Sequence, residues 1–287
     1  MSIKNTGART ARAILLAATI ALLQGATALA ADSGCEELVI PAAAQRLGLT
    51  KLVIDSCPGL DDVSTDGRGH FPWYSGHQWR PPGKQPKRDS YAANEQGQLV
   101  IKLGGSIAAV SRMMKPGKFP LLSGAKPFYV EFTYKLSSQD QDHFPAVWMM
   151  PVEHARGQPD HYAGDPPRFQ RWFELDVDEG GFTKGFMGTA LSWSGVFPGY
   201  KRVRSNPRWD VPPLDRSQIN TFAAAYQPDD LKVTWWLNGK EQYSAGPPAV
   251  PEIARLQNFY PIIGVASRGK NIPYEMTIIR IRAFVAE

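Results

Sequence analysis

The chain contains little cysteine and histidine, and after residue 30 it has no long hydrophobic run. Its only two cysteines, Cys35 and Cys57, are accompanied by no histidine motif, which argues against a catalytic thiol. The five histidines never stand at the spacing of a metal-ligand pair, so we expect loop or surface histidines. The Gly104-Gly105 pair lacks the lysine of a phosphate-binding loop. We therefore expect no cofactor and no catalytic metal, and nothing in the sequence indicates a structural calcium ion.

Residues 1–30 have the pattern of a secretory signal peptide. Basic residues come first, the apolar run Ala13–Leu23 follows, and Ala28-Leu29-Ala30 offers a small-x-small cleavage site. The apolar run is too short to span a bilayer, and nothing after it resembles a membrane span. We therefore expect a secreted or periplasmic protein with no membrane partner after cleavage.

The net charge gives no reason to expect a nucleic acid partner. The formal charge of the whole chain is +5, but the leader contains three basic residues and no acidic one, which leaves +2. We expect a monomer. In an oxidising compartment Cys35 and Cys57 should form a disulfide that closes a loop of about twenty residues, worth ~2–4 kcal/mol.

Short β-rich runs bounded by Gly, Pro, Ser or Asp succeed one another along most of the chain. They are Lys51–Asp55, Gly97–Leu103, Phe128–Leu136, Ala146–Met150, Phe169–Val177, Gly185–Trp193, Thr221–Tyr226, Leu231–Leu237, Glu241–Ser244, Tyr260–Ala266 and Tyr274–Phe284. Asn238-Gly239 predicts a hairpin, and only Ile40–Leu49 has a helical pattern. No linker divides residues 31–287. The pattern predicts one all-β domain, an antiparallel sandwich or jelly roll.

A stretch rich in glycine, proline and aromatic residues covers residues 66–88. Its prolines fix φ, so we expect a surface loop of defined shape. Trp73, Tyr74 and Trp79 within it form either a lid over a cleft or a hydrophobic plug, and the sequence does not choose between the two.

Four carboxylates lie within six residues, at Glu174, Asp176, Asp178 and Glu179. On a strand the first three would share one face, while the apolar residues between them point to the other. Like charges on one face raise the cost of ionising each other, so this crowding calls for a metal, a bound cation or an acid–base pair. A calcium loop would draw its ligands from turns, whereas these acids lie in an alternating strand.

The motif Glu174-Leu-Asp-Val-Asp-Glu179 resembles the E-x-D-x-x-E signature of glycoside hydrolase family 16, which includes laminarinases, lichenases, agarases and exopolysaccharide depolymerases. Phe144–Pro151 is similar to the family's W-P-A-x-W-x-x-P strand, and Leu231–Tyr243 to its W-Y-V-D-G-K hairpin. The resemblance covers roughly residues 95–285. It implies a concanavalin A-like jelly roll with a concave substrate cleft. It also implies a retaining endo-glycosidase that hydrolyses β-glycosidic bonds in a polysaccharide by double displacement.

The resemblance also assigns roles to the acids. It implies that Glu174 is the nucleophile, that Asp176 assists it by hydrogen bonding, and that Glu179 is the general acid/base. A retaining enzyme needs its two carboxyls about 5–5.5 Å apart. Residues four or five apart on a flat strand have Cα atoms ~13–16 Å apart, so a concave sheet is required.

Glu179 does not follow the two-residue alternation of a strand, because it stands five residues after Glu174 and a regular strand would turn it toward the core. A β-bulge between Asp176 and Glu179 would return Glu179 to the face of Glu174. Without a bulge, Asp178 would be the proton donor instead. We favour Glu179, because the longer side chain reaches further and because this spacing is the family's commoner form.

Tryptophans near the acids are candidates for stacking on sugar rings. Trp172 shares the face of Glu174, and by resemblance it is a substrate platform, with a packed strand tryptophan as the alternative. Trp148 is equally compatible with core packing and sugar contact, and Trp193 and Trp209 are candidate rim contacts. Of Trp235 and Trp236, which face opposite ways, at least one should be core.

Two features depart from the family pattern. Gly188–Trp193 lacks the histidine of the G-T-x-H block, and Phe144 replaces the first tryptophan of W-P-A-x-W. Because of these two departures the sequence does not indicate a subgroup of the family, but the acids of the motif are all present.

A basic cluster follows these strands, formed by Lys201, Arg202, Arg204 and Arg208. It is either a solvated loop or a rim that contacts an anionic polysaccharide. Two other functions remain on the same fold: a non-catalytic, lectin-like carbohydrate-binding protein, and a transglycosylase. The intact acid set opposes the first of these.

Overall fold

The computed structural model describes residues 35, 39–80, 84–154, 162–181, 185–205 and 214–287, and the account below concerns the unit Ser33–Glu287. The predicted signal peptide over residues 1–30 lies outside the described residues, as do Arg208 and Trp209. Within the described ranges, no helix has the length and apolar character needed to cross a bilayer.

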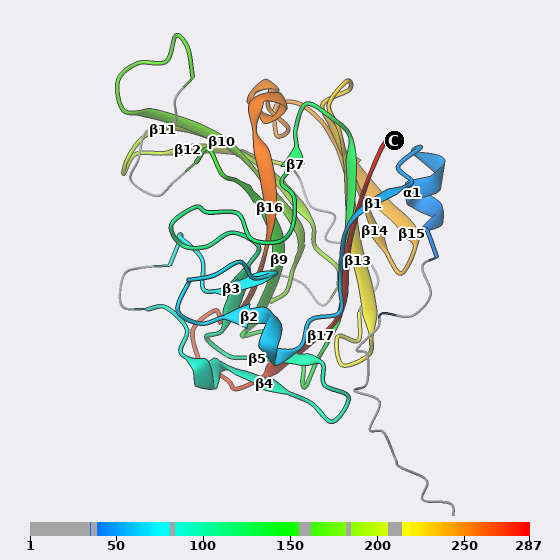
Figure 1. Cartoon of the computed structure of the whole chain (residues 1–287). Coiled ribbons are helices and arrows are strands. Elements are labelled where there is room, and N and C mark those ends of the chain that lie inside the picture. The colour runs from blue at the N-terminus through cyan, green and yellow to red at the C-terminus, as the bar shows by residue number, and fades with distance from the viewer. Residues whose placement is uncertain (1–34, 36–38, 81–83, 155–161, 182–184, 206–213) are drawn as a thin grey trace, which may run out of the picture. The chain divides into compact units, whose positions relative to one another are not determined.

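Two sheets make up the unit, as Figure 1 shows. Sheet I has eight strands in the described residues, and β1 lies beside β17, off the main path. In order they are β15 (Lys240–Ala245), β14 (Lys232–Leu237), β13 (Asn220–Gln227), β8 (Phe128–Leu136), β17 (Glu275–Val285), β5 (Leu99–Lys102) and β4 (Tyr91–Ala93), with β1 (Lys51–Ser56).

Sheet II has nine strands in the described residues, and β7 pairs with β16 off the main path. In order they are β12 (Lys201–Arg204), β11 (Thr189–Val196), β10 (Phe169–Glu179), β9 (His143–Pro151), β16 (Asn258–Ser267), β6 (Ser106–Ala108), β3 (Trp73–Ser75) and β2 (Val63–Ser64), with β7 (Leu122–Ser123). All pairings of these strands are antiparallel except that of β2 with β3. This architecture confirms the expected all-β sandwich.

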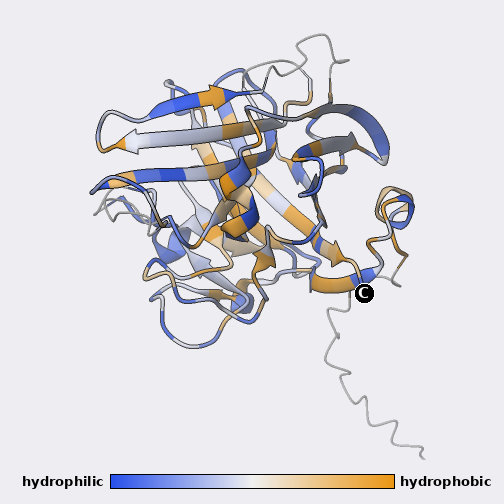
Figure 2. Ribbon diagram, turned by 90° about the horizontal axis from the view of Figure 1, so that it is seen from above, coloured by the Kyte–Doolittle hydropathy of each residue, from blue (hydrophilic) through white to orange (hydrophobic). Residues whose placement is uncertain are grey.

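The main core lies between the two sheets and is built by alternation along the strands. Phe173, Leu175 and Val177 of β10 are fully buried in it, and the ring of Phe173 lies 6.0 Å from that of Tyr226 on sheet I. Figure 2 shows hydrophobic and hydrophilic residues alternating along the strands. Burying this apolar surface is the main force that holds the sheets together.

Helical structure is confined to short pieces in the described residues: α1 (Ala42–Arg46), η1 (Leu60–Asp62), η2 (Arg88–Ser90) and η3 (Glu252–Leu256). The helix α1 packs on the outer face of sheet I, where Ala43 and Ala44 join Tyr129 and Trp236 in a second core cluster (Figure 1). Trp235 points the other way, into the main core, so both tryptophans of the hairpin are buried.

A disulfide joins Cys35 to Cys57, with a Cα–Cα distance of 5.7 Å. Cys57 directly follows β1, which is paired with β17, so the bond ties Cys35, which precedes α1 in the chain, to sheet I.

Sequence reasoning missed the shortest strands. Lys201–Arg204 was expected in a loop but forms the edge strand β12, paired with β11 from Leu191 to Ser194. A run of basic residues with one valine has no apolar alternation, so its sequence carries no strand signal. Exposed lysine and arginine are nevertheless common on edge strands, where they discourage further pairing.

Candidate active site

A β-bulge interrupts β10 inside the acid motif. Asp176 lies opposite Trp148 of β9, while Asp178 lies opposite the next residue, Val147, so Val177 is an extra residue without a partner. Past the bulge the alternation is reversed: Asp178 is fully buried, and Glu179 is only partly buried. Of the two arrangements considered for this strand, the structure therefore has the bulged one.

Three carboxyls meet on the face of sheet II that is turned away from the core; we call it the acid face. Asp176 and Glu179 are hydrogen-bonded to each other, and the charge of Glu179 acts on Glu174. The sequence-based expectation was a hydrogen bond from Asp176 to Glu174; in the structure Asp176 bonds to Glu179.

Burial and mutual repulsion hold protons on these groups. Burial, followed by the charge of Glu179, raises the pKa of Glu174 to about 7. Burial and the charges of both glutamates raise the pKa of Asp176 well above its usual range. Burial also raises the pKa of Glu179, while the hydrogen bond from Asp176 and the charge of Arg204 oppose the rise. The three carboxyls therefore share protons as one set and do not titrate independently.

Trp193 on β11 contacts Glu174 directly. Its indole Nε1 donates a hydrogen bond to Glu174 Oε2 at 2.7 Å, and this bond favours the ionised carboxylate. The guanidinium of Arg202, from β12, lies over the Trp193 ring at 5.5 Å. Trp193, which was predicted as a rim contact, is thus a hydrogen-bond donor to Glu174.

Trp172 lies in a stack of aromatic rings. His154 is parallel to it with ring centroids 3.6 Å apart, Trp193 is parallel at 5.5 Å, and Tyr200 meets it edge-on at 4.9 Å. Its side chain is only 4% exposed. The ring expected to receive a sugar is therefore covered in this structure, and Trp193 is the more exposed ring of the pair.

In the described part of segment 66–88, the aromatic side chains pack in two different places. Trp73 and Tyr74 are buried; Trp73 belongs to the main core and donates its Nε1 hydrogen to Ser56 Oγ at 3.0 Å. Trp79 instead stacks on His154 at 4.6 Å and is hydrogen-bonded to Tyr260. Tyr260 alternates with the core residue Phe259, so Trp79 covers the acid-face side of β16.

The same segment is anchored next to Trp148. His77 meets the Trp148 ring edge-on at 5.6 Å, and Arg80 Nη1 donates to the carbonyl oxygen of Gly104 at 2.6 Å. Burial lowers the pKa of His77 to about 3, with a smaller contribution from the charge of Arg80. His77 is therefore a neutral side chain that packs on the acid face.

One histidine expectation was wrong: His143 begins β9 and is buried, with its ring 4.0 Å from that of Tyr274. His154 follows β9 in a loop, as expected, but is fully buried in the aromatic stack. Neither belongs to a metal site: in the described ranges, no cluster of three or more His, Cys, Asp or Glu side chains is arranged to hold an ion.

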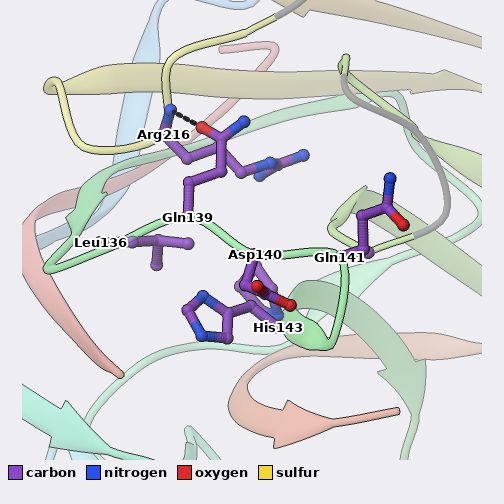
Figure 3. Close-up of a pocket in the computed structure, with 8 residues that line it drawn as sticks. Leu136, Gln139, Asp140, Gln141, His143 and Arg216 are labelled. Atoms are coloured by element: carbon purple, nitrogen blue, oxygen red, sulfur yellow. Dashed lines mark hydrogen bonds between the residues drawn. The ribbon is translucent and has the colours of Figure 1, made fainter. Parts of the chain in front are cut away.

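A separate cavity of about 410 Å³ opens at the end of β9 (Figure 3). It is lined by Leu136, Gln139, Asp140, Gln141, His143, Pro145, Gly181 and Arg216. None of the four motif acids lines it. Arg216 is shared between this cavity and the acid motif, because its side chain reaches Asp178.

Comparison with known proteins supports the fold. No family model and no curated protein matches the chain. One matching solved structure comes from work on endo-acting O-glycanases that human gut bacteria express to initiate mucin breakdown. It is 16% identical, with a TM-score of 0.51 over 83% of this chain and 100% of that one. The two chains therefore share a fold.

Two further matches are a laminarinase and an endo-glucanase. The laminarinase, from Flavobacterium sp. UMI-01, is 15% identical, with a TM-score of 0.49 over 82% of this chain and 100% of that one. The family 16 endo-glucanase, from Bacteroides ovatus, is 12% identical, with a TM-score of 0.49 over 74% and 93%. At such identities the similarity concerns the fold, and function has to be argued from the residues of this chain.

Proposed function

We propose that the chain is a retaining endo-glycosidase that hydrolyses β-glycosidic bonds in a polysaccharide. The observation that carries the proposal is the bulge in β10, which turns Glu179 to the side of Glu174 and Asp176. In this account Glu174 is the nucleophile, Glu179 the general acid/base, and Asp176 the residue that assists them.

The reaction would proceed in two displacements. In the first, Glu174 attacks the anomeric carbon while Glu179 donates its proton to the departing glycosidic oxygen, which leaves a glycosyl ester on Glu174. In the second, Glu179 removes a proton from water, and the resulting hydroxide oxygen attacks the anomeric carbon and releases Glu174. The configuration at that carbon is retained because it is inverted twice.

The environments of the two glutamates suit these roles. Glu174 must be ionised to attack, and the Trp193 indole hydrogen at 2.7 Å stabilises its negative charge. Glu179 must begin protonated, and burial raises its pKa. Formation of the ester removes the charge of Glu174, so the acid face loses repulsion and Glu179 releases its proton more readily for the second step.

Asp176 acts through its hydrogen bond to Glu179. Its pKa is raised well above the usual range by burial and by the two glutamates, so it holds a proton that it shares with Glu179. We infer that it adjusts the charge on the acid face as the proton of Glu179 leaves and returns.

The substrate contacts follow from the rings and cations beside the acids. We infer that Trp193 forms part of the sugar-binding surface and that Arg202, stacked above it, favours a polysaccharide with anionic groups. Trp148 beside His77 is a second candidate contact, and Trp172 supports the surface from below. Secretion through the leader, action as a monomer and independence of cofactors belong to the same proposal.

The test is release of reducing ends from β-glucans, galactans and acidic polysaccharides by wild type and by Glu174→Gln. We expect the substitution to lower kcat by roughly 10⁴-fold or more, since it removes the nucleophile. Glu131→Gln, which changes a buried acid on sheet I, is the matched control and should leave kcat unchanged. A fully active Glu174→Gln enzyme would refute the nucleophile assignment.

The competing functions give different results in that screen. A lectin-like protein would bind a polysaccharide and release nothing, in wild type and variant alike. A transglycosylase would produce longer chains without a matching rise in reducing ends.

A further inference from the structure

Asp178 lies between two acids of the proposed site but faces the interior. Its carboxylate accepts from Arg216 through both oxygens, Oδ2 from Nη1 at 2.5 Å and Oδ1 from Nη2 at 2.9 Å. The side chains of Asp178 and Arg216 are 0% and 5% exposed. The Tyr134 hydroxyl from sheet I donates to the same Oδ2 at 2.5 Å. This is a fully buried, bidentate pair.

The guanidinium of Arg216 is held in place by groups other than Asp178. Its Nη2 donates to the carbonyl oxygen of Gly185 at 3.3 Å, and its carbon lies 5.3 Å from the ring of Phe222. Its backbone N–H donates to Gln139 Oε1 at 2.8 Å, the bond drawn in Figure 3, and its carbonyl accepts from Leu136 N at 2.8 Å. The position of the two donors of the fork therefore does not depend on Asp178 alone.

The pair of Asp178 and Arg216 also helps to fix the backbone hydrogen bonds around Glu179. Met187 N donates to Asp178 Oδ1 at 3.4 Å, and Met187 O accepts from Glu179 N at 2.8 Å. Gly180 N then donates to Pro145 O at 2.9 Å. With Asp178 turned inward, these bonds direct the Glu179 side chain to the opposite side, toward Asp176.

In a regular strand, without the bulge, the side chains of Asp178 and Glu179 would each point to the opposite side of the sheet. Asp178 would join Glu174 and Asp176 on the acid face, while Glu179 would point inward and Arg216 would lose the carboxylate that it binds. A buried guanidinium without its partner is strongly unfavourable, whereas a short carboxylate fits its fork. The cost of separating the pair therefore opposes the regular register.

We propose that Arg216 is a positioning residue for Glu179: by holding Asp178 in the interior, it selects the bulged register of β10 that turns Glu179 to the acid face. The catalytic consequence rests on the proposed function, in which Glu179 is the acid/base. The register itself does not depend on that function.

The first test is the crystal structure of Arg216→Leu. We expect Asp178 to leave the interior, where its charge would be unpaired, and the register shift between Asp176 and Asp178 to disappear. In the double variant Asp178→Leu/Arg216→Leu, the apolar side chain introduced at position 178 should remain inside and restore the bulge with Glu179 on the acid face. An unchanged bulge in Arg216→Leu would overturn the proposal.

The second test is kinetic, on the polysaccharide that wild type cleaves and on an aryl glycoside with a 2,4-dinitrophenol leaving group. This leaving group needs no proton to depart. Arg216→Leu should lose kcat on the polysaccharide by 10²-fold or more and much less on the aryl glycoside, and the double variant should recover both. A stability defect alone would lower both rates by the same factor.

Arg282→Leu is the matched control, since it breaks the buried pair of Arg282 with Glu131 on sheet I. It should lower stability without changing the ratio of the two rates. Glu179→Gln separates the two proposals. If that variant keeps full activity on the polysaccharide, the acid/base assignment fails, while the crystal structures still judge the register.

If Arg216→Leu does not fold, Arg216→Lys takes its place. Lysine keeps the charge but cannot donate two parallel hydrogen bonds, so kcat on the polysaccharide should fall about 10-fold, with a smaller loss on the aryl glycoside. Wild-type rates on both substrates in Arg216→Lys would overturn the proposal.

Discussion

Buried carboxylates of two kinds occur in this molecule, and their partners differ. Glu131 on sheet I is paired with Arg282 at 2.5 Å and accepts from the hydroxyl of Tyr129. Asp178 on sheet II has the same arrangement, an arginine and a tyrosine hydroxyl. The acids of the acid face interact mainly with each other, with one indole hydrogen bonded to Glu174 and with the charges of Arg202 and Arg204 nearby.

The difference separates structural charge from titrating charge. An arginine at hydrogen-bonding distance compensates a buried negative charge, whereas carboxyls that face one another in a buried place retain protons. The proposed chemistry needs groups that gain and lose a proton, so only the second kind can supply it. The predictions below test this division.

Among the tests of this division, removal of the proposed acid/base should have the largest effect. Glu179→Gln should lower kcat on a polysaccharide by about 10²–10⁴-fold, because the leaving oxygen then receives no proton. The aryl glycoside described above should remain a good substrate for the first step. Glu131→Gln measured in parallel should keep kcat, and a loss as large as that of Glu179→Gln would remove the distinction between the two kinds of acid.

Stability should change in opposite directions for the two kinds. Arg282→Leu leaves Glu131 without its partner and should reduce the free energy of unfolding by about 1–3 kcal/mol, less than for a fully buried pair because Arg282 is partly exposed. Asp176→Asn should raise the midpoint of urea unfolding at pH 7, since Asp176 must take up a proton on folding at this pH and asparagine needs none. A lower midpoint would contradict the raised pKa of Asp176.

The pH dependence of stability follows from the same shifts. The pKa of Glu174 rises from 4.5 to about 7 on folding, so between these values the native state binds more protons than the unfolded one. Stability from this group is therefore fully present below pH 4.5 and is lost as the pH rises through about 7. Urea midpoints of wild type and Glu174→Gln should converge as the pH is lowered from about 8 to about 4.5; a constant gap would contradict the shift.

The smallest effect is expected at the indole hydrogen. Trp193→Phe removes the donor to Glu174, which raises the pKa of this carboxyl and moves the acidic limb of the kcat/KM profile to higher pH. We expect a loss of about 10-fold in kcat/KM near neutral pH, as for one hydrogen bond to a charged group. Phenylalanine keeps the ring, so an equal loss at every pH would indicate a packing effect instead.

The sequence predicted the acid strip correctly where the period of two holds. Leu175 and Val177 point into the core as their alternation requires. The bulge was favoured from the reach of Glu179 and from the spacing of the family that the motif resembles, and not from the strand itself, because Arg216, the partner of Asp178, lies 38 residues away in the sequence. No local pattern connects the two residues.

The side chains that surround Trp172 could not be predicted from the sequence, for a similar reason. Its strand position indicates its face, but the rings that cover it, His154 and Trp79, come from segments without a regular period. Nothing in the sequence indicates that a tryptophan in a proline-rich loop and a histidine after a strand contact each other in the folded protein. The fold is specified by many alternating strands, whereas the site depends on a few contacts between distant segments.

The most direct test of the proposed mechanism is to trap its covalent intermediate. The protein would be incubated with a 2-deoxy-2-fluoro glycoside bearing a 2,4-dinitrophenyl leaving group, made on the oligosaccharide that the polysaccharide screen selects, and its peptides analysed by mass spectrometry. The account predicts one added glycosyl group, on Glu174. A label on Asp178 or Glu179, or an active enzyme that forms no adduct, would contradict it.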